Sequence, residues 1–269
     1  MDKLCLHTIT TKPLSFEQAL QRYSEKGIPA ISIWQNAILE IGPKRARKLL
    51  DNYQLEVVSY VRGGFFPNIN ADLRKQAITN NKIMLREAAE IGAPLLVLVC
   101  GADPKQSLST SREQIKEGIE RLLPTAESMG VRLGLEPLHP MYAHSRSAIN
   151  TMKQANDFTD EIRHDLLGIV VDVFHLWWEE NLRSEIMHAG QHKKLFAYHI
   201  CDWKMPMNDL LNDRGLMGDG CINLAEIGQW MKEAGFNGYH EVEIFSNHYW
   251  SMDQNKFLNK IIERYNAIK

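Results

Sequence analysis

The sequence predicts a (β/α)₈ barrel, and two observations lead there. Short β-rich runs alternate with helical segments along the whole chain, as in a parallel sheet built from βαβ units. Charged or imidazole side chains also close four successive runs, and the carboxyl ends of the strands are where such barrels carry their chemistry. The predicted strands are residues 4–9, 30–34, 56–61, 95–100, 131–136, 168–172, 196–200 and 239–245. Their starts lie roughly 25 to 45 residues apart, which leaves room for one helix between neighbours.

The segments between the runs carry helix signals. Three pairs have the spacing of an N-cap and its N3 residue, namely Ser15 with Gln18, Ser111 with Gln114, and Asn223 with Glu226. Four glycines each stand where a helix should end just before a strand, namely Gly27, Gly92, Gly130 and Gly235. Each strand is therefore expected to be followed by its own helix.

No linker or low-complexity stretch divides the chain, so residues 1–269 are expected to form a single barrel domain. A doubly wound open sheet is the main rival. The first strand is followed by neither GxGxxG nor GxxxxGK[ST], so the usual nucleotide signatures of that rival are missing.

The amino-acid composition and the net charge of the chain exclude some classes of function. The 269 residues are 44% hydrophobic and carry a formal net charge of −2, which is ordinary for a globular enzyme and argues against binding nucleic acid. No stretch has the roughly 18 apolar residues that a membrane span needs. The first residues contain no long apolar run, so we expect no signal peptide. The four cysteines form no CxxC pair, which favours reduced thiols in a cytoplasmic protein. A homo-oligomer is left open.

The four runs in question end on Glu136, Asp172, His199 and the pair Glu241 and Glu243. Burying one carboxylate alone is costly, but several are tolerated together when a cation neutralises them. Carboxylate and imidazole ligands suit one divalent metal ion, Mn²⁺, Zn²⁺, Co²⁺ or Mg²⁺, rather than a soft thiolate site. The sequence therefore predicts a metal site at the C-terminal end of the barrel.

Each residue taken alone has a structural alternative. Asp172 could simply cap the helix that follows it, and His199 could be a buried histidine of the core. Glu241 and Glu243 point to the same side of their strand, and one of them could serve only in a salt bridge. The metal site rests on the joint pattern of four consecutive strands.

On its motifs, the chain resembles the xylose-isomerase-like barrel superfamily, and within it the sugar phosphate isomerase/epimerase proteins. The resemblance covers nearly the whole chain. Its strongest pieces are Arg62-Gly-Gly-Phe-Phe-Pro67, Leu135-Glu136-Pro-Leu-His139-Pro140, Asp172-Val-Phe-His175, His199 with Asp202, Gly218-Asp-Gly220 and Gly238-Tyr-His-Glu-Val-Glu243-Ile-Phe245. These motifs are specific for the superfamily and say little about the substrate.

The resemblance implies the roles of the site residues. The metal ligands are Glu136, Asp172, His199 and Glu243, with Glu243 chosen over Glu241 because the family residue directly precedes the Ile-Phe pair. His175 and Arg214 would contact the substrate. Asp202, two positions into the loop past a ligand, could orient His199 from behind, and Glu241 is placed in the same supporting layer.

Other residues are expected around the pocket only because they lie at or near the ends of the predicted strands. Trp34, Phe65, Phe66, Trp177 and Trp203 lie at or just beyond strand ends and could wall it against a sugar. Arg62 and Lys204 could bind a phosphate or carboxylate of the substrate.

The implied activity is isomerisation or epimerisation of a small sugar-like carbohydrate through a metal-stabilised enediolate. Glu136 and Glu243 are then the catalytic acid–base pair on opposite sides of the substrate. The alternative is dehydration of an inosose-like polyol, which begins with the same proton removal. Phosphodiester hydrolysis of the endonuclease IV type is disfavoured because Arg62 and Cys100 stand where that three-zinc scheme needs histidines.

Overall fold

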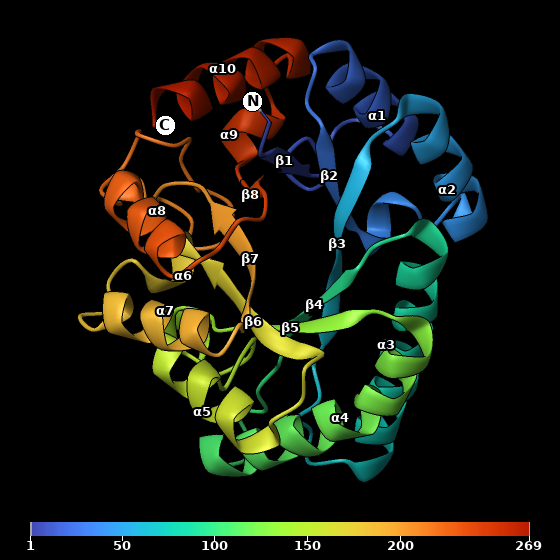
Figure 1. The fold of residues 1–269 in the computed structure, drawn as a ribbon, viewed down its shortest axis with the longest axis vertical. Helices are drawn as coiled ribbons and strands as arrows, with labels where there is room; N and C mark the ends of the chain where they lie inside the picture. The colour runs from blue at the N-terminus through green and yellow to red at the C-terminus, as the bar shows by residue number, and fades with distance from the viewer. Residues whose placement is uncertain (1, 269) are drawn as a thin grey trace.

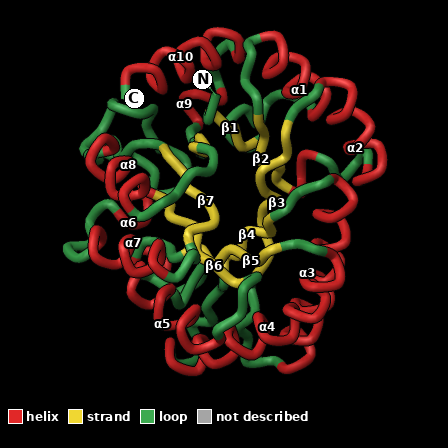
Figure 2. The backbone as a smooth tube through the Cα atoms, viewed as in Figure 1, coloured by secondary structure: helices red, strands yellow, loops and turns green. Residues whose placement is uncertain are grey.

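The computed structural model describes residues 2–268, and within them eight parallel strands close into a barrel in sequence order. Figure 1 looks down the ring, with the helices outside the strands and the two ends of the chain near each other. Figure 2 shows the same arrangement as an inner ring of strands and an outer ring of helices. The predicted barrel is confirmed, and the open-sheet alternative is wrong because β1 pairs with β8.

The strands agree closely with the predicted runs. They are β1 (Leu4–His7), β2 (Ala30–Trp34), β3 (Glu56–Gly64), β4 (Leu95–Val99), β5 (Arg132–Glu136), β6 (Leu167–Asp172), β7 (Leu195–Ile200) and β8 (His240–Val242). The last strand ends sooner than predicted, so Glu243 lies just beyond it. Its backbone N–H still donates to the carbonyl of Ile200 at 3.2 Å, which keeps Glu243 against the end of β7.

The helices surround the strands. They are α1 (Phe16–Glu25), α2 (Gly42–Tyr53), α3 (Ala71–Ile91), α4 (Leu108–Met129), α5 (Met152–Ile162), α6 (Val173–Leu176), α7 (Leu182–Gln191), α8 (Leu224–Glu233), α9 (Asn247–Trp250) and α10 (Gln254–Ala267). Two single 3₁₀ turns, η1 (Gln35–Ala37) and η2 (Pro140–Tyr142), follow β2 and β5.

Two of the three predicted N-caps are confirmed. Ser15 forms a full capping box with Gln18, and the Asn223 side chain accepts from the backbone N–H of Glu226. The prediction for Ser111 is wrong. Helix α4 begins one turn earlier with Ser107 as its cap, and Ser111 is buried inside the helix. All four helix-ending glycines have positive φ, as predicted.

The inside of the barrel changes from apolar to polar along its axis. A compact cluster of Val61, Leu95, Val97, Val170 and Ala197 fills the lower part of the ring, with Phe196 against it. Because side chains alternate across a strand, the residue two positions after Val170 points to the same interior, and so does the one two after Ala197. Those residues are Asp172 and His199. The apolar layer therefore forms the floor beneath a polar layer at the C-terminal end.

No helix within residues 2–268 is long and apolar enough to cross a membrane. The four cysteines are free thiols, three of them buried and Cys221 exposed.

Candidate active site

The sheet register brings the predicted ligands side by side. Asp172 on β6 is the register partner of His199 on β7, and His199 is the partner of Glu241 on β8. Register partners in a parallel sheet face the same side, so all three side chains enter the barrel at one level. Glu136 closes β5 next to β6, and Glu243 follows β8.

The four predicted ligands meet in one buried cluster. One potential ligand atom from each of Glu136, Asp172, His199 and Glu243 lies within 4.8 Å of all the others. His199 Nδ1 is 3.1 Å from Glu136 Oε1 and 4.0 Å from Glu243 Oε2. All four side chains are almost fully buried, so their charges are poorly compensated by water.

Arg214 is the cation that stabilises this cluster from the protein side. Its Nη1 lies 3.0 Å from Asp172 Oδ2 and 3.1 Å from Glu243 Oε2, and its Nη2 lies 3.2 Å from His175 Nε2. The guanidinium is buried and packs over the Phe174 ring at 4.3 Å. Arg214 thus fixes two of the carboxylates while it lines the pocket.

The pKa values reflect these neighbours. Burial raises the pKa of Glu136, and it raises that of Asp172 despite the nearby Arg214. Burial alone would lower the pKa of His199, but Glu241, Glu136 and Glu243 together raise it to about 10. Burial would raise the pKa of Glu243, but His7, Arg214 and His199 outweigh it and hold that pKa low.

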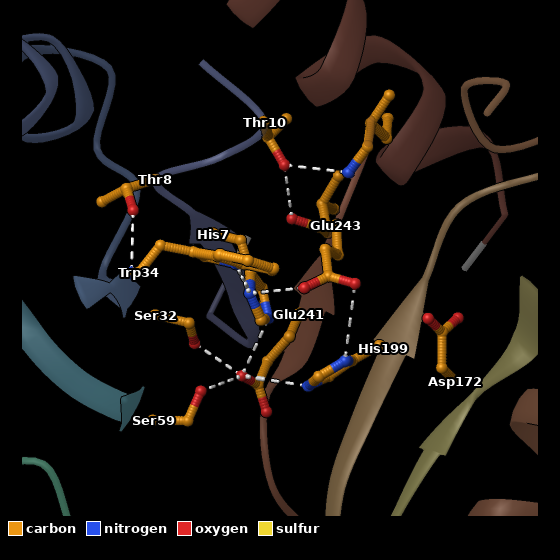
Figure 3. A network of polar contacts seen from close by, with 12 residues as sticks. His7, Thr8, Thr10, Ser32, Trp34, Ser59, Asp172, His199, Glu241 and Glu243 are labelled. Atoms are coloured by element: carbon orange, nitrogen blue, oxygen red, sulfur yellow. Dashed lines mark hydrogen bonds and ion pairs between the residues drawn. The ribbon is translucent and has the colours of Figure 1, made fainter. Parts of the chain in front are cut away.

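Glu241 lies beside the cluster, on the Nε2 side of His199. Figure 3 shows its carboxylate at the centre of a group of contacts from four strands. Its Oε2 accepts from Ser32 Oγ at 2.5 Å and Ser59 Oγ at 2.9 Å, and lies 3.3 Å from His7 Nε2 and 3.7 Å from His199 Nε2. Glu241 therefore faces the ring nitrogen of His199 that does not face Glu136.

Sequence reasoning missed His7, although it closes β1 as Glu136 closes β5 and Asp172 closes β6. Its Nδ1 lies 3.1 Å from Glu243 Oε1 and its Nε2 lies beside Glu241, so it bridges the two glutamates of the last strand (Figure 3). Trp34 Nε1 also lies 3.2 Å from His7 Nδ1. The signal was present in Leu-Cys-Leu-His, an apolar run that ends on an imidazole.

Asp202 does not contact His199. Its two oxygens accept backbone N–H groups of its own loop, those of Trp203, Ile222 and Gly218, at 2.8 to 3.0 Å. The side chain turns toward the loop because these amides have no other partner there. Asp202 therefore holds the β7–α8 connection, and the supporting role predicted for it is not what the structure shows.

Lys204 is likewise engaged elsewhere. Its ammonium pairs with Asp213 across the base of the same loop, and Lys204 does not line the cavity at the cluster. Of the aromatic residues expected at the pocket, only Trp34 lines it. Phe66 is buried against Gly118, Trp177 and Trp203 pack on the core, and Phe65 is exposed beside Arg62.

A cavity of about 390 Å³, including the open space at its mouth, lies over the cluster. The predicted residues Trp34, Arg62, His175 and Arg214 line it together with Glu136 and Glu243. Among the lining residues that sequence reasoning missed are the polar Tyr142 and Arg146, because they lie on the irregular segment after β5 where no pattern marks them. The Tyr142 hydroxyl donates to the Leu210 carbonyl at 2.5 Å and so ties this segment to the β7–α8 loop.

The donor set fits a divalent metal ion. Within residues 2–268, Glu136 Oε1 and both ring nitrogens of His199 are buried without a hydrogen-bond partner. Buried polar atoms normally have a partner, and those that lack one require an explanation. Three carboxylates and one imidazole are the ligand types that Mn²⁺, Zn²⁺, Co²⁺ and related ions accept.

The sequence of the chain is similar to those of several sugar isomerases and epimerases. Over 214 residues it is 28% identical to an inosose isomerase of Bacillus velezensis, covering 76% of this chain and 72% of that protein. It is 23% identical to the fructoselysine 3-epimerase of Shigella flexneri, covering 99% and 98% of the two chains.

Solved structures share the fold. A protein of Sinorhizobium meliloti 1021 superimposes with a TM-score of 0.96 and 38% identity, covering 99% of this chain and 98% of that one. The IolI protein with a bound zinc atom superimposes with a TM-score of 0.85 and 22% identity, covering 99% and 97%. The xylose isomerase-like TIM barrel family matches residues 20–261. The chain therefore belongs to the xylose isomerase-like TIM barrel family.

Proposed function

We propose that this protein is a divalent-metal-dependent isomerase or epimerase of a small sugar or sugar-like substrate. The observation that carries the proposal is the buried cluster of Glu136, Asp172, His199 and Glu243 at the C-terminal end of the barrel. Its relatives named inosose isomerase and fructoselysine 3-epimerase support the same reaction class.

In this proposal, Glu136, Asp172, His199 and Glu243 hold one metal ion. A bound divalent ion polarises the substrate carbonyl and stabilises the negative charge that develops when the neighbouring carbon loses its proton. His199 would bind through Nδ1, the nitrogen beside Glu136, because its Nε2 faces Glu241.

Glu136 and Glu243 are the proposed proton-transfer pair. Glu136 ends β5 and Glu243 lies just beyond β8, three strands apart in the ring of eight, and both line the cavity. A substrate seated between them presents a different face to each carboxylate. An epimerase uses both, one removing a proton and the other returning it to the opposite face, whereas an isomerase can use one.

Arg214 and His175 are proposed to orient the reacting end of the substrate. Arg214 holds Glu243 through its Nη1 at 3.1 Å and so aims that carboxylate. Because Arg214 donates from Nη2 toward His175 Nε2, the proton of a neutral His175 ring lies on Nδ1. That Nδ1 is buried without a partner, and we assign it to a hydroxyl of the substrate.

The test is turnover by protein freed of metal and reconstituted with Mn²⁺, Co²⁺, Zn²⁺ or Mg²⁺. Ketoses, aldoses, their phosphates and inososes are incubated in deuterated water, and the products are followed by NMR and mass spectrometry. We expect metal-dependent conversion without loss of water, together with exchange of one carbon-bound proton. A product lighter by one water would instead indicate a dehydratase. Turnover that survives complete metal removal would refute the proposal.

A further inference from the structure

Two arginines of the pocket form no hydrogen bond and no ion pair through their side chains within residues 2–268. Within the described residues, neither the Arg62 nor the Arg146 guanidinium makes a hydrogen bond or an ion pair, although both line the cavity over the cluster. Their contacts are with ring faces. Arg62 lies 4.7 Å from the Phe65 ring centre and 5.5 Å from that of Trp34, and Arg146 lies 5.5 Å from that of Tyr142. Their N–H donors therefore remain available.

Two positive charges in one small cavity repel each other, so their proximity alone is electrostatically unfavourable. Burial lowers the pKa of the Arg62 guanidinium and the charge of Arg146 lowers it further, with Glu243 and Glu136 acting in the opposite direction. Neither arginine comes within ion-pair distance of those carboxylates, in contrast to Arg214, which contacts two of the cluster. Two forked guanidiniums with free donors form a suitable site for a planar or tetrahedral oxyanion.

The two arginines share one side of the barrel mouth. Arg62 lies near the end of β3. The Arg146 carbonyl accepts from the N–H of Gly101, which places Arg146 beside the end of the neighbouring strand β4. In the ring of eight, β3 stands opposite β7, which carries His199. A ligand that reaches the cluster with one end therefore extends toward the arginines with the other.

We propose that the substrate is a sugar derivative with a phosphate or carboxylate group, and that Arg62 and Arg146 bind this anion on the β3–β4 side of the cavity. This inference rests on the proposed function and specifies its substrate class. The sequence alone suggested Arg62 and Lys204 as the residues that bind an anion of the substrate. The proposed site has Arg146 in place of Lys204, because Lys204 forms an ion pair with Asp213 and lies outside the cavity.

The experiment compares matched substrates on the metal-reconstituted enzyme. Each ketose is assayed beside its terminal phosphate and beside the analogue that carries a terminal carboxylate. We expect kcat/KM to favour the anionic member by about ten- to a hundredfold, the range that a charge-assisted hydrogen bond carries. The preferred anion shows which of the two groups the site binds. Arg146→Gln and Arg62→Gln should each remove most of that preference, mainly through KM, so that kcat/KM falls much more for the anionic substrate than for the neutral ketose.

Four controls accompany the comparison. Arg45→Gln removes the same charge from an exposed arginine of α2 outside the cavity and should change nothing. Arg146→Lys keeps the charge but loses the fork, and should recover only part of the preference. Binding of inorganic phosphate to the metal-free chain, measured by calorimetry, should weaken in both glutamine variants. Thermal unfolding verifies that each variant is folded.

Equal losses on neutral and anionic substrates, with phosphate binding unchanged, would overturn the proposal and make the arginines counterions of the carboxylates. If the wild type turns over no substrate but the variants still lose phosphate binding, then the isomerase assignment fails and the anion site stands. A wild-type enzyme that prefers neutral sugars would overturn the anion site alone.

Discussion

Glu241 Oε2 lies 3.7 Å from His199 Nε2, and Glu136 Oε1 lies 3.1 Å from Nδ1 of the same ring. The imidazole of His199 thus lies between the buried carboxylates of Glu241 and Glu136, and these two carboxylates differ in their hydrogen bonds. Oε2 of Glu241 already accepts from Ser32 and Ser59, whereas Oε1 of Glu136 has no hydrogen bond. Glu241 therefore faces Nε2 and Glu136 faces Nδ1, and neither ring nitrogen has a hydrogen-bond partner within residues 2–268.

The first prediction follows from that arrangement. Glu241→Gln should weaken metal binding by roughly 10–100-fold, because carboxylates behind a histidine ligand orient it and raise its basicity. Competition against a chelator of known affinity measures the effect. Ser59→Ala, which removes one of the hydrogen bonds to Glu241 Oε2, should give a smaller loss in the same direction. Unchanged affinity in both variants would show that Glu241 is only structural.

The second prediction separates Asp202 from that role. Asp202→Asn should leave metal affinity close to the wild type, because its oxygens bind loop amides and not His199. It should instead loosen residues 203–222, which hydrogen exchange or limited proteolysis would detect. A loss of metal affinity as large as that of Glu241→Gln would restore the role first expected for Asp202.

The third prediction concerns Glu136 and Glu243, the two glutamates proposed to transfer the proton. At saturating metal, Glu136→Gln and Glu243→Gln should each reduce turnover by roughly 10²–10⁴-fold, the usual contribution of a positioned acid or base. Both should also slow exchange of the carbon-bound proton in deuterated water. Saturating metal is needed because an amide oxygen is a weaker ligand than a carboxylate. Wild-type turnover in both variants would exclude the proposed roles.

The fourth prediction concerns metal and stability. A ligand that binds the folded chain at about 100 times its Kd adds about 2.7 kcal/mol to the free energy of unfolding. The melting temperature should therefore rise by roughly 5 °C or more when metal is restored after chelation. Asp172→Asn is the matched comparison, and its melting temperature should respond much less. An equal rise in wild type and variant would place the metal elsewhere.

The fifth prediction tests the barrel wall next to Arg62. Gly64 has φ +101°, and a Cβ there would lie 2.0 Å from the Val99 carbonyl oxygen. Gly130 also has positive φ, +66°, but a Cβ there would meet nothing within 4 Å. Gly130→Ala should cost only the roughly 1–2 kcal/mol of a left-handed alanine, and Gly64→Ala clearly more. Denaturant unfolding of both variants provides the comparison.

Most of the barrel could be predicted because strand and helix signals are local. Strand ends shifted by one to three residues, as at β8, since the exact end depends on neighbouring strands that the sequence does not reveal. Ser111 was mistaken for a cap because Ser107, four residues earlier, has an equally good side chain and the helix extends to it.

The site was predictable where residues close strands and not where they lie in loops. Glu136, Asp172 and His199 gather because parallel strands end at one edge, which the topology dictates. The choice between Asp202 and Glu241 as the support of His199 depends on sheet register, and the pairing of His199 with Glu241 emerges only in the folded barrel. Arg146 was missed because the segment after β5 has no periodicity that predicts where its side chains lie.

The ring places its metal-type ligands on β5 to β8 and its unpaired arginines over β3 and β4. Substitutions in the two arcs can therefore accumulate separately during evolution. Under the proposed function, a duplicated copy of this protein could exchange Arg62 and Arg146 for other side chains, and accept a different substrate, while it keeps all four residues of the proposed metal site.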